Sequence, residues 1–357
     1  MWGSPVGSSL MVSRRTLVLG APIAWMGKLR GANEAVSEFI FDSAPFPSCH
    51  ASTVVELPNG DLMSAWFGGT AEGKPDVAIW ASQRAAGKWT EPVEMVRESQ
   101  TPCWNPVLFY TKDSRLWLYY KFGTSPSQWT AARKYSSDHG KSWSAVEHLP
   151  AGIYGPIRAK PLVMEDGAIV SGTSVESYRT WTAWIERSTD GGKTFSRIGP
   201  ITLPDTSGGA DDGKSTRGLI QPSVISLGGK KLRMYMRSTQ NIGRVCAADS
   251  ADAGLTWSQA RPLDVPNPNS GIDAAALRDG RVVLIYNNTS KGRSPLNLAV
   301  SRDGERFTMF RTLEDTPDEE FSYPNVIQGK DGDLHIVYTW RRKKIRYVRL
   351  ALKDVPK

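Results

Sequence analysis

The sequence has little cysteine and no long apolar segment. Only 3 of its 357 residues are cysteine, which is too few for a disulfide framework. No uninterrupted apolar run reaches the roughly eighteen residues of a transmembrane helix. The net charge of +8 is scattered rather than gathered into the basic stripe that nucleic-acid binding requires. With 40% hydrophobic residues and 13 Trp, the chain is too apolar for a disordered protein. These features predict a soluble protein with a packed core and no affinity for nucleic acid.

Residues 1–35 are predicted to be an export signal and leader. The pair Arg14-Arg15 precedes an apolar run over residues 17–26. This order is typical of a twin-arginine signal, and the run is too short to span a bilayer. We therefore expect export to the periplasm or the medium, with residues 36–357 as the mature domain.

A turn motif of the form Ser-x-Asp-x-Gly-x-x-aromatic recurs along the chain. It occupies residues 136–143, 188–195 and 250–257, with a copy one residue shorter at 301–307 and a degenerate copy at 81–89. In such a hairpin turn, Ser and Asp bind backbone N–H groups, Gly takes a positive φ and the aromatic ring packs into the core. Alternating or apolar runs typical of strands flank the copies, and helix signals are nearly absent.

A repeat of roughly fifty to sixty residues with about four short strands is typical of a propeller blade. The five marked repeats and a sixth unit made from the C-terminal strands predict an all-β, six-bladed β-propeller. A strand near residues 38–41 would complete the last blade and close the ring.

The repeated turns resemble the Asp boxes, or BNR repeats, of the sialidase superfamily, and the resemblance runs from about Phe39 to Leu350. In that family the boxes lie on the face opposite the active site. The resemblance therefore implies the fold and says little about the chemistry.

Three further segments are similar to sialidase segments that carry functional groups. Sialidases hold the sugar carboxylate with three arginines, use a Tyr nucleophile polarised by a Glu, and use an Asp as acid and base. The resemblance places two of the arginines at Arg237, in MYMRS, and at Arg293, in SKGRSP. It places the nucleophile at Tyr323, in FSYPNV.

Two positions depart from the sialidase pattern. When the strand HASTVVELPNG is aligned by its Pro-x-Gly ending, His50 stands in the place of the remaining arginine. Gln221 stands in the place of the Glu, and a neutral amide cannot accept the Tyr proton. For the acid and base, the loop after the first inner strands offers Asp76, with Glu72 as its rival. Burial could tune either carboxyl group to act near neutral pH.

Other residues stand where inner strands begin, and we expect them to contact sugar hydroxyls or a sugar ring, although ordinary turn chemistry also accounts for several of them. The candidates for hydroxyl contacts are Asn105, Lys160, Glu176, Arg217 and Asp273, and the candidate for stacking on a ring is Trp66.

No cofactor or metal ion is expected. The four histidines, at positions 50, 139, 148 and 335, lack the paired spacing of metal ligands, and phosphate-binding glycine motifs are absent. An oxidising compartment would permit a disulfide between Cys49 and Cys103, and two buried free thiols fit the sequence equally well.

The leading hypothesis is a monomeric, exo-acting, sialidase-like glycoside hydrolase that removes a terminal acidic sugar from a glycan. A hydrolase directed at uronides or rhamnosides, or a polysaccharide lyase in which His50 or Tyr323 removes a proton beside a carboxylate, fits the two departures. A non-catalytic sugar-binding propeller is the third alternative.

Overall fold

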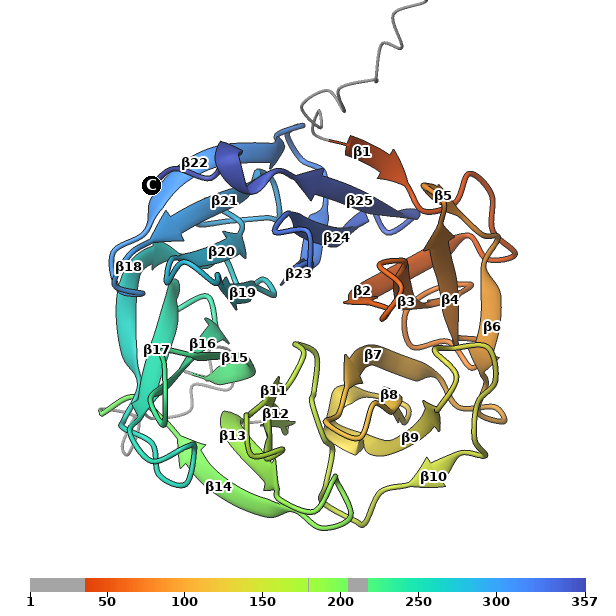
Figure 1. Cartoon of the computed structure of the whole chain (residues 1–357), viewed down its shortest axis with the longest axis horizontal. Helices are drawn as coiled ribbons and strands as arrows, with labels where there is room; N and C mark the ends of the chain where they lie inside the picture. Colours follow the sequence, from red (N-terminus) through yellow and green to blue (C-terminus); the bar gives the residue numbers. More distant parts are fainter. Residues whose placement is uncertain (1–35, 179, 205–217) are drawn as a thin grey trace, which may run out of the picture. The chain divides into compact units, whose positions relative to one another are not determined.

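The computed structural model describes residues 36–178, 180–204 and 218–357. The predicted export signal and Arg217 lie outside these residues. The described chain forms six antiparallel sheets and two short 3-10 helices, η1 (Pro126–Gln128) and η2 (Leu352–Asp354). No helix in the described ranges is long and apolar enough to cross a membrane. The sheets stand around a common centre as the blades of a propeller, which confirms the predicted fold (Figure 1).

Each blade begins with its inner strand, nearest the centre of the ring (Figure 1). Blade 1 consists of β2 (Ser48–Glu56), β3 (Leu62–Gly69), β4 (Ala78–Ala85) and β5 (Lys88–Trp89), with β6 (Val93–Val96) also paired to β4. Blade 2 consists of β7 (Cys103–Tyr110), β8 (Leu116–Phe122), β9 (Thr130–Ser136) and β10 (Glu147–His148). Blade 3 consists of β11 (Leu162–Val163), β12 (Ile169–Glu176), β13 (Trp181–Ser188) and β14 (Ser196–Ile201).

The remaining blades follow the same order. Blade 4 consists of β15 (Leu219–Ser226), β16 (Leu232–Ser238), β17 (Arg244–Ser250) and β18 (Arg261–Pro266). Blade 5 consists of β19 (Asp273–Ala276), β20 (Val282–Tyr286), β21 (Leu296–Ser301) and β22 (Thr308–Glu314). Blade 6 consists of β23 (Phe321–Gln328), β24 (Leu334–Trp340), β25 (Lys344–Leu350) and β1 (Val36–Phe39).

The ring is closed by pairing the first strand with the last. Strand β1 lies antiparallel to β25, with Val36 opposite Arg349 and Phe39 opposite Arg346. The predicted closing strand is therefore present, two residues earlier than expected. Since β1 supplies the outer strand of blade 6, the two ends of the propeller stabilise one another.

The Asp boxes form the hairpins between the third and fourth strands of blades 2 to 5. In blade 3, the Asp190 carboxylate accepts hydrogen bonds from the Thr194 hydroxyl at 2.7 Å and from the Ser188 hydroxyl at 2.8 Å, while the Gly192 N–H donates to Ser188 Oγ. An arginine of the preceding blade then holds the box, because Arg133 Nη1 donates to the Gly192 carbonyl at 2.6 Å. The repeated motif thus sets both the turn and the contact between blades.

The apolar core lies between the blades. Six hydrophobic clusters are present in the described residues, and each is centred on a different pair of neighbouring blades. Because successive side chains of a strand point to opposite faces of its sheet, the central strands of a blade supply apolar groups to the blades on both sides. The inner ends of the blades are left to polar residues, and these form the candidate site.

Candidate active site

Four inner strands carry the same irregularity close to their first residue. The pairing register of β2, β7, β15 and β23 shifts there, and at each shift a non-glycine residue has a positive φ. The values are 57° for Ala51, 34° for Asn105, 54° for Gln221 and 51° for Tyr323. A bulge re-aims a side chain, and such backbone conformations persist only where the surrounding structure holds them. The bulges therefore mark one end of the central ring as the candidate site.

The Tyr323 hydroxyl lies at the centre of a hydrogen-bond network at this end of the ring. Its oxygen accepts hydrogen bonds from Arg237 Nη1 at 2.8 Å and from Gln221 Nε2 at 3.1 Å. Arg237 Nη1 also donates to Gln221 Oε1 at 3.3 Å, and Arg237 Nε donates to Asn269 Oδ1 at 2.8 Å. Because a guanidinium cannot accept a hydrogen bond, Arg237 fixes the Gln221 amide with its NH₂ toward Tyr323. The structure thus brings together three residues that the sequence singled out.

Arg158 is a further cation at the site, and sequence reasoning missed it in favour of Lys160. Its guanidinium carbon lies 5.1 Å from the centre of the Tyr323 ring. Its Nη1 donates to the Ile272 carbonyl at 2.9 Å and its Nη2 donates to the Pro324 carbonyl. Arg158 is only 4% exposed. It therefore ties the inner ends of blades 3, 5 and 6 together beneath the Tyr323 ring.

His50 also lies against the Tyr323 ring. The two ring centroids are 4.1 Å apart, and Nδ1 of His50 is 3.0 Å from Thr339 Oγ1. Nε2 is buried and has no hydrogen-bond partner among the residues that the structure describes. Burial lowers the pKa of His50 well below its usual value, and the nearby positive charges of Arg342, Arg293, Arg158 and Arg237 lower it further. His50 is therefore a neutral imidazole at neutral pH.

Arg293 lies beside the same ring, with its guanidinium carbon 5.6 Å from the Tyr323 centroid. Its Nη1 donates to Glu320 Oε1 at 2.7 Å. The other oxygen of Glu320 accepts a hydrogen bond from Arg342 Nε at 2.9 Å, and Arg342 Nη1 donates to Glu72. Burial acts to raise the pKa of Glu320, but Arg293 and Arg342 outweigh it and hold the pKa below its ordinary value. Arg342 was not predicted from the sequence.

Asp273, which is buried, forms an ion pair with the partly exposed Lys160. Lys160 Nζ lies 2.9 Å from Asp273 Oδ2. The Asp273 carboxylate also accepts hydrogen bonds from the Ser223 hydroxyl at 2.6 Å, the Asn325 amide at 3.0 Å and the Val326 N–H at 2.9 Å. These contacts join blades 3 to 6 behind the site. Both residues are thus bonded within the protein, and their contact with sugar hydroxyls remains a prediction.

Glu176 and Asn105 are buried at the same end of the ring. Glu176 Oε1 accepts a hydrogen bond from the Ser174 hydroxyl at 3.1 Å. Burial raises the pKa of Glu176, against the opposing charge of Arg237 and the bond from Ser174. The Asn105 carbonyl accepts a hydrogen bond from the fully buried Lys121 Nζ at 3.3 Å. Glu176 is thus a carboxyl group that retains its proton to a higher pH than usual, close to Arg237.

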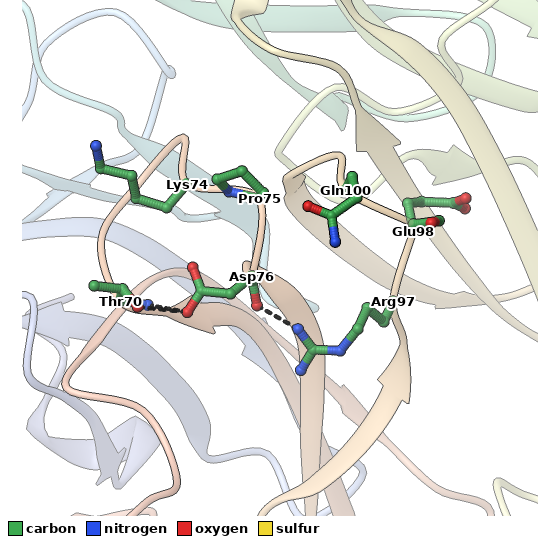
Figure 2. A pocket seen from close by; sticks show the side chains of 8 residues that line it. Thr70, Lys74, Pro75, Asp76, Arg97, Glu98 and Gln100 are labelled. Atoms are coloured by element: carbon green, nitrogen blue, oxygen red, sulfur yellow. Dashed lines mark hydrogen bonds between the residues drawn. The ribbon is translucent and has the colours of Figure 1, made fainter.

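Asp76 lies in the β3–β4 loop and is exposed. Its Oδ2 accepts hydrogen bonds from the Thr70 hydroxyl at 2.6 Å and the Thr70 N–H at 2.8 Å. The Thr70 hydroxyl is the main cause of its lowered pKa. Figure 2 shows the carboxylate turned toward Thr70, with Arg97 reaching the Asp76 carbonyl.

Asp76 lines a pocket of about 700 Å³. The other residues of this pocket are Thr70, Lys74, Pro75, Arg97, Glu98, Ser99 and Gln100 (Figure 2). None of the residues around Tyr323 is among them. The assignment of Asp76 as acid and base remains a prediction, whereas Glu72, in the same loop, reaches the Tyr323 region through Arg342.

Trp66 belongs to the core and not to the site. Its side chain is fully buried, and its ring is stacked on Phe41 with the centroids 5.2 Å apart. The expectation that Trp66 stacks on a sugar ring is therefore wrong, because the face of β3 that carries Trp66 packs against blade 6.

All three cysteines are buried. Cys49 and Cys103, the two that could have formed a disulfide, are free thiols. Burial is the main cause of the raised pKa of Cys49 and raises that of Cys103 to about 12. Of the two possibilities that the sequence left open, the structure shows free thiols. No group of three or more potential metal ligands is arranged to hold an ion within the described residues.

Comparison with known proteins agrees with the geometry. The profile of the family described as BNR repeat-like domain matches residues 60–336. No match was found among curated proteins. Among solved structures, a protein of unknown function from Dyadobacter fermentans is 17% identical with a TM-score of 0.72, and the match covers 88% of this chain and 97% of that one.

Two sialidase structures are similar as well. The NanB sialidase from Streptococcus pneumoniae is 13% identical with a TM-score of 0.70, over 89% of this chain and 71% of that one. The intramolecular trans-sialidase from Ruminococcus gnavus is 14% identical with a TM-score of 0.69, over 89% of this chain and 97% of that one. These identities establish the fold alone. The family match, which spans most of the chain, shows that the protein belongs to the BNR repeat-like domain family.

Proposed function

We propose that the protein is an exported, exo-acting glycoside hydrolase that removes a terminal acidic sugar from a glycan. The observation that carries the proposal is the Tyr323 hydroxyl, which is held by Arg237 and Gln221 and has Arg293 beside its ring. Guanidinium groups suit a carboxylate because their N–H groups match its two oxygens. A tyrosine between such groups is placed to react at a carbon next to that carboxylate.

The reaction would proceed in two displacements. The Tyr323 proton passes to water, since Gln221 cannot accept it, and Arg237 stabilises the phenolate through its 2.8 Å hydrogen bond. The phenolate oxygen bonds to the anomeric carbon while the bond to the leaving oxygen breaks, and a carboxylic acid protonates that oxygen. Water then attacks the anomeric carbon, gives a proton to the carboxylate, and displaces Tyr323.

The proton donor is selected by its pKa. A general acid must still hold its proton near the working pH. The hydrogen bonds from Thr70 lower the pKa of Asp76, which disfavours this role in the free protein. Burial raises the pKa of Glu176, close to Arg237. We therefore place the proton donor at Glu176, with Asp76 as its rival in the β3–β4 loop.

Elimination at a uronide is the second candidate, and His50 favours it. The neutral imidazole lies beside Tyr323, and its buried Nε2, to which no described residue binds, is suited to accept a proton. In that reaction the base takes the proton from the carbon next to the carboxylate, a carbon–carbon double bond forms, the bond to the leaving oxygen breaks, and that oxygen takes up a proton from water. The arginines would stabilise the charge that develops on the carboxylate.

One experiment separates these functions. The purified mature protein is incubated with a panel of sialosides and uronides, and the released sugars are analysed together with the ultraviolet absorbance of the mixture. Hydrolysis releases a saturated acidic sugar without new absorbance, as the proposal expects. Appearance of the absorbance of an unsaturated uronide would replace hydrolysis by elimination. Binding without turnover of any substrate would identify a sugar-binding propeller.

A further inference from the structure

We infer that Arg342 supplies the third arginine of the carboxylate site, so that the substrate carboxylate is held by Arg237, Arg293 and Arg342. This inference rests on the proposed function, and it names the group that compensates for His50. In the sialidase pattern the third guanidinium comes from the inner strand of blade 1. Here it comes from the turn between β24 and β25 of blade 6.

The backbone places this turn directly beside His50. The carbonyl of Arg342 accepts a hydrogen bond from the N–H of Cys49 at 2.9 Å, and Cys49 precedes His50 in β2. His50 in turn contacts Thr339, at the end of β24. The turn of blade 6 therefore crosses to blade 1 at the position where the sequence lacks an arginine.

The ion pairs of Arg342 orient its side chain toward Arg293. Glu320 binds Arg293 with one oxygen, at 2.7 Å, and Arg342 with the other, at 2.9 Å. The two guanidiniums consequently flank a single carboxylate group. Glu72 binds Arg342 from the β3–β4 loop and fixes it from the other side. The Arg342 side chain remains 29% exposed, so that solvent reaches it.

Each of the three arginines retains a donor that the described residues leave unused. No described residue accepts a hydrogen bond from Nη2 of Arg237, Arg293 or Arg342. Arg158 differs, because both of its terminal nitrogens donate to backbone carbonyls, and its Nε, which has no partner among the described residues, is buried. The geometry thus distinguishes three arginines that keep a terminal NH₂ group for a ligand from one whose terminal groups both bind the scaffold.

The balance of charge at this end of the ring also favours the binding of an anion. Four arginines surround Tyr323 and His50, and two carboxylates, Glu72 and Glu320, form ion pairs with two of them, Arg293 and Arg342. Asp273 is paired with Lys160, and burial raises the pKa of Glu176. His50 adds no charge at neutral pH because its pKa is lowered. Among the described residues, the positive charge therefore exceeds the negative, as the binding of a sugar carboxylate requires.

The test compares an acidic sugar with its uncharged ester. Binding of N-acetylneuraminate, glucuronate and their methyl esters to the mature protein is measured by calorimetry for the wild type and for Arg342→Gln. Arg341→Gln is the matched control, because Arg341 lies in the same turn, has the same φ of 53° and pairs with Glu319 instead. Arg342→Lys keeps the positive charge but lacks the paired N–H donors of the guanidinium group. Melting curves are used to check that every variant folds.

The expected result is a loss of about 10- to 100-fold in the preference of Arg342→Gln for the acid over the ester. Arg342→Lys should lose less, and Arg341→Gln should lose nothing. A folded Arg342→Gln protein with the full preference for the acid would overturn this inference and leave the proposed acidic substrate intact. A wild-type protein without that preference for either sugar would overturn the proposed function and this inference with it.

Discussion

Gln221→Glu is the substitution that most directly tests the role of Tyr323. Gln221 Nε2 lies 3.1 Å from the Tyr323 oxygen, and Oε1 lies 3.3 Å from Arg237 Nη1. A glutamate of the same shape would keep the contact with Arg237 and replace the amide donor with an acceptor for the Tyr323 proton. The proton that now has to pass to water would acquire a base within hydrogen-bond distance.

The size of the effect follows from the geometry. A positioned general base contributes about 10²- to 10⁴-fold in rate, which corresponds to about 3–5 kcal/mol of activation free energy. Gln221 is only 2% exposed, so the new carboxylate would be buried at a cost of several kcal/mol. The attraction of Arg237 at 3.3 Å offsets this by about 5 kcal/mol at an effective dielectric constant of about 20. We therefore expect a folded protein with nearly the wild-type melting temperature.

The assay is the release of a chromogenic leaving group from an aryl sialoside across a pH series. Gln221→Glu should be faster than the wild type by about 100-fold, and its rate should rise with pH as the new carboxyl group ionises. Gln221→Met, which has a similar size and no polar group at this position, should show no such gain. If Gln221→Glu folds normally and gains nothing on the sialoside, Tyr323 does not act as a nucleophile that is limited by its proton.

Three other predictions concern the proton donor, the Asp boxes and the export signal. Glu176→Gln should reduce turnover of substrates with poor leaving groups much more than Asp76→Asn does. The reason is that burial raises the pKa of Glu176 while hydrogen bonds lower that of Asp76. A larger loss in Asp76→Asn would identify Asp76 as the proton donor. Hydrogen bonds from Thr194 hold the pKa of Asp190 below its unfolded value of about 3.9. Its stabilisation is therefore complete above that pH and is lost as the pH falls further, so Asp190→Asn should lower the melting temperature at pH 7 and flatten its fall in acid. Lysines in place of Arg14 and Arg15 should leave the precursor in the cytoplasm on cell fractionation, and unchanged export would exclude the twin-arginine mechanism.

The fold could be predicted from local sequence because the information for it is local. Each Asp box carries its own hydrogen-bonding groups, such as Ser188 and Asp190, within a single turn. Five such turns at similar spacing specify repeated hairpins, and hairpins of this length specify blades. The closing strand was also predictable, because one strand remained before the first complete repeat. It begins at Val36, since pairing with β25 decides the boundary.

The site was only partly predictable, because it is assembled from blades that are distant in the chain. Arg237, Gln221 and Tyr323 were found through segments that resemble a known family, and the structure brings them into contact. Arg158 was missed, although it precedes the inner segment of blade 3 much as Gln221 begins that of blade 4. Trp66 was misplaced because the sequence gives the alternation along a strand and not which face meets the neighbouring blade.

What the sequence by itself determined is the number of blades, the turn chemistry and the identity of several side chains of the candidate site. Only the tertiary structure decided which polar groups form their hydrogen bonds and ion pairs within the protein. Asp273 and Arg158 are hydrogen-bonded to residues of other blades. Arg342, one of two adjacent arginines in a turn, binds Glu320 and Glu72 at the candidate site. Hydrogen bonds between residues far apart in sequence depend on how the blades close the ring, and no local pattern records that geometry.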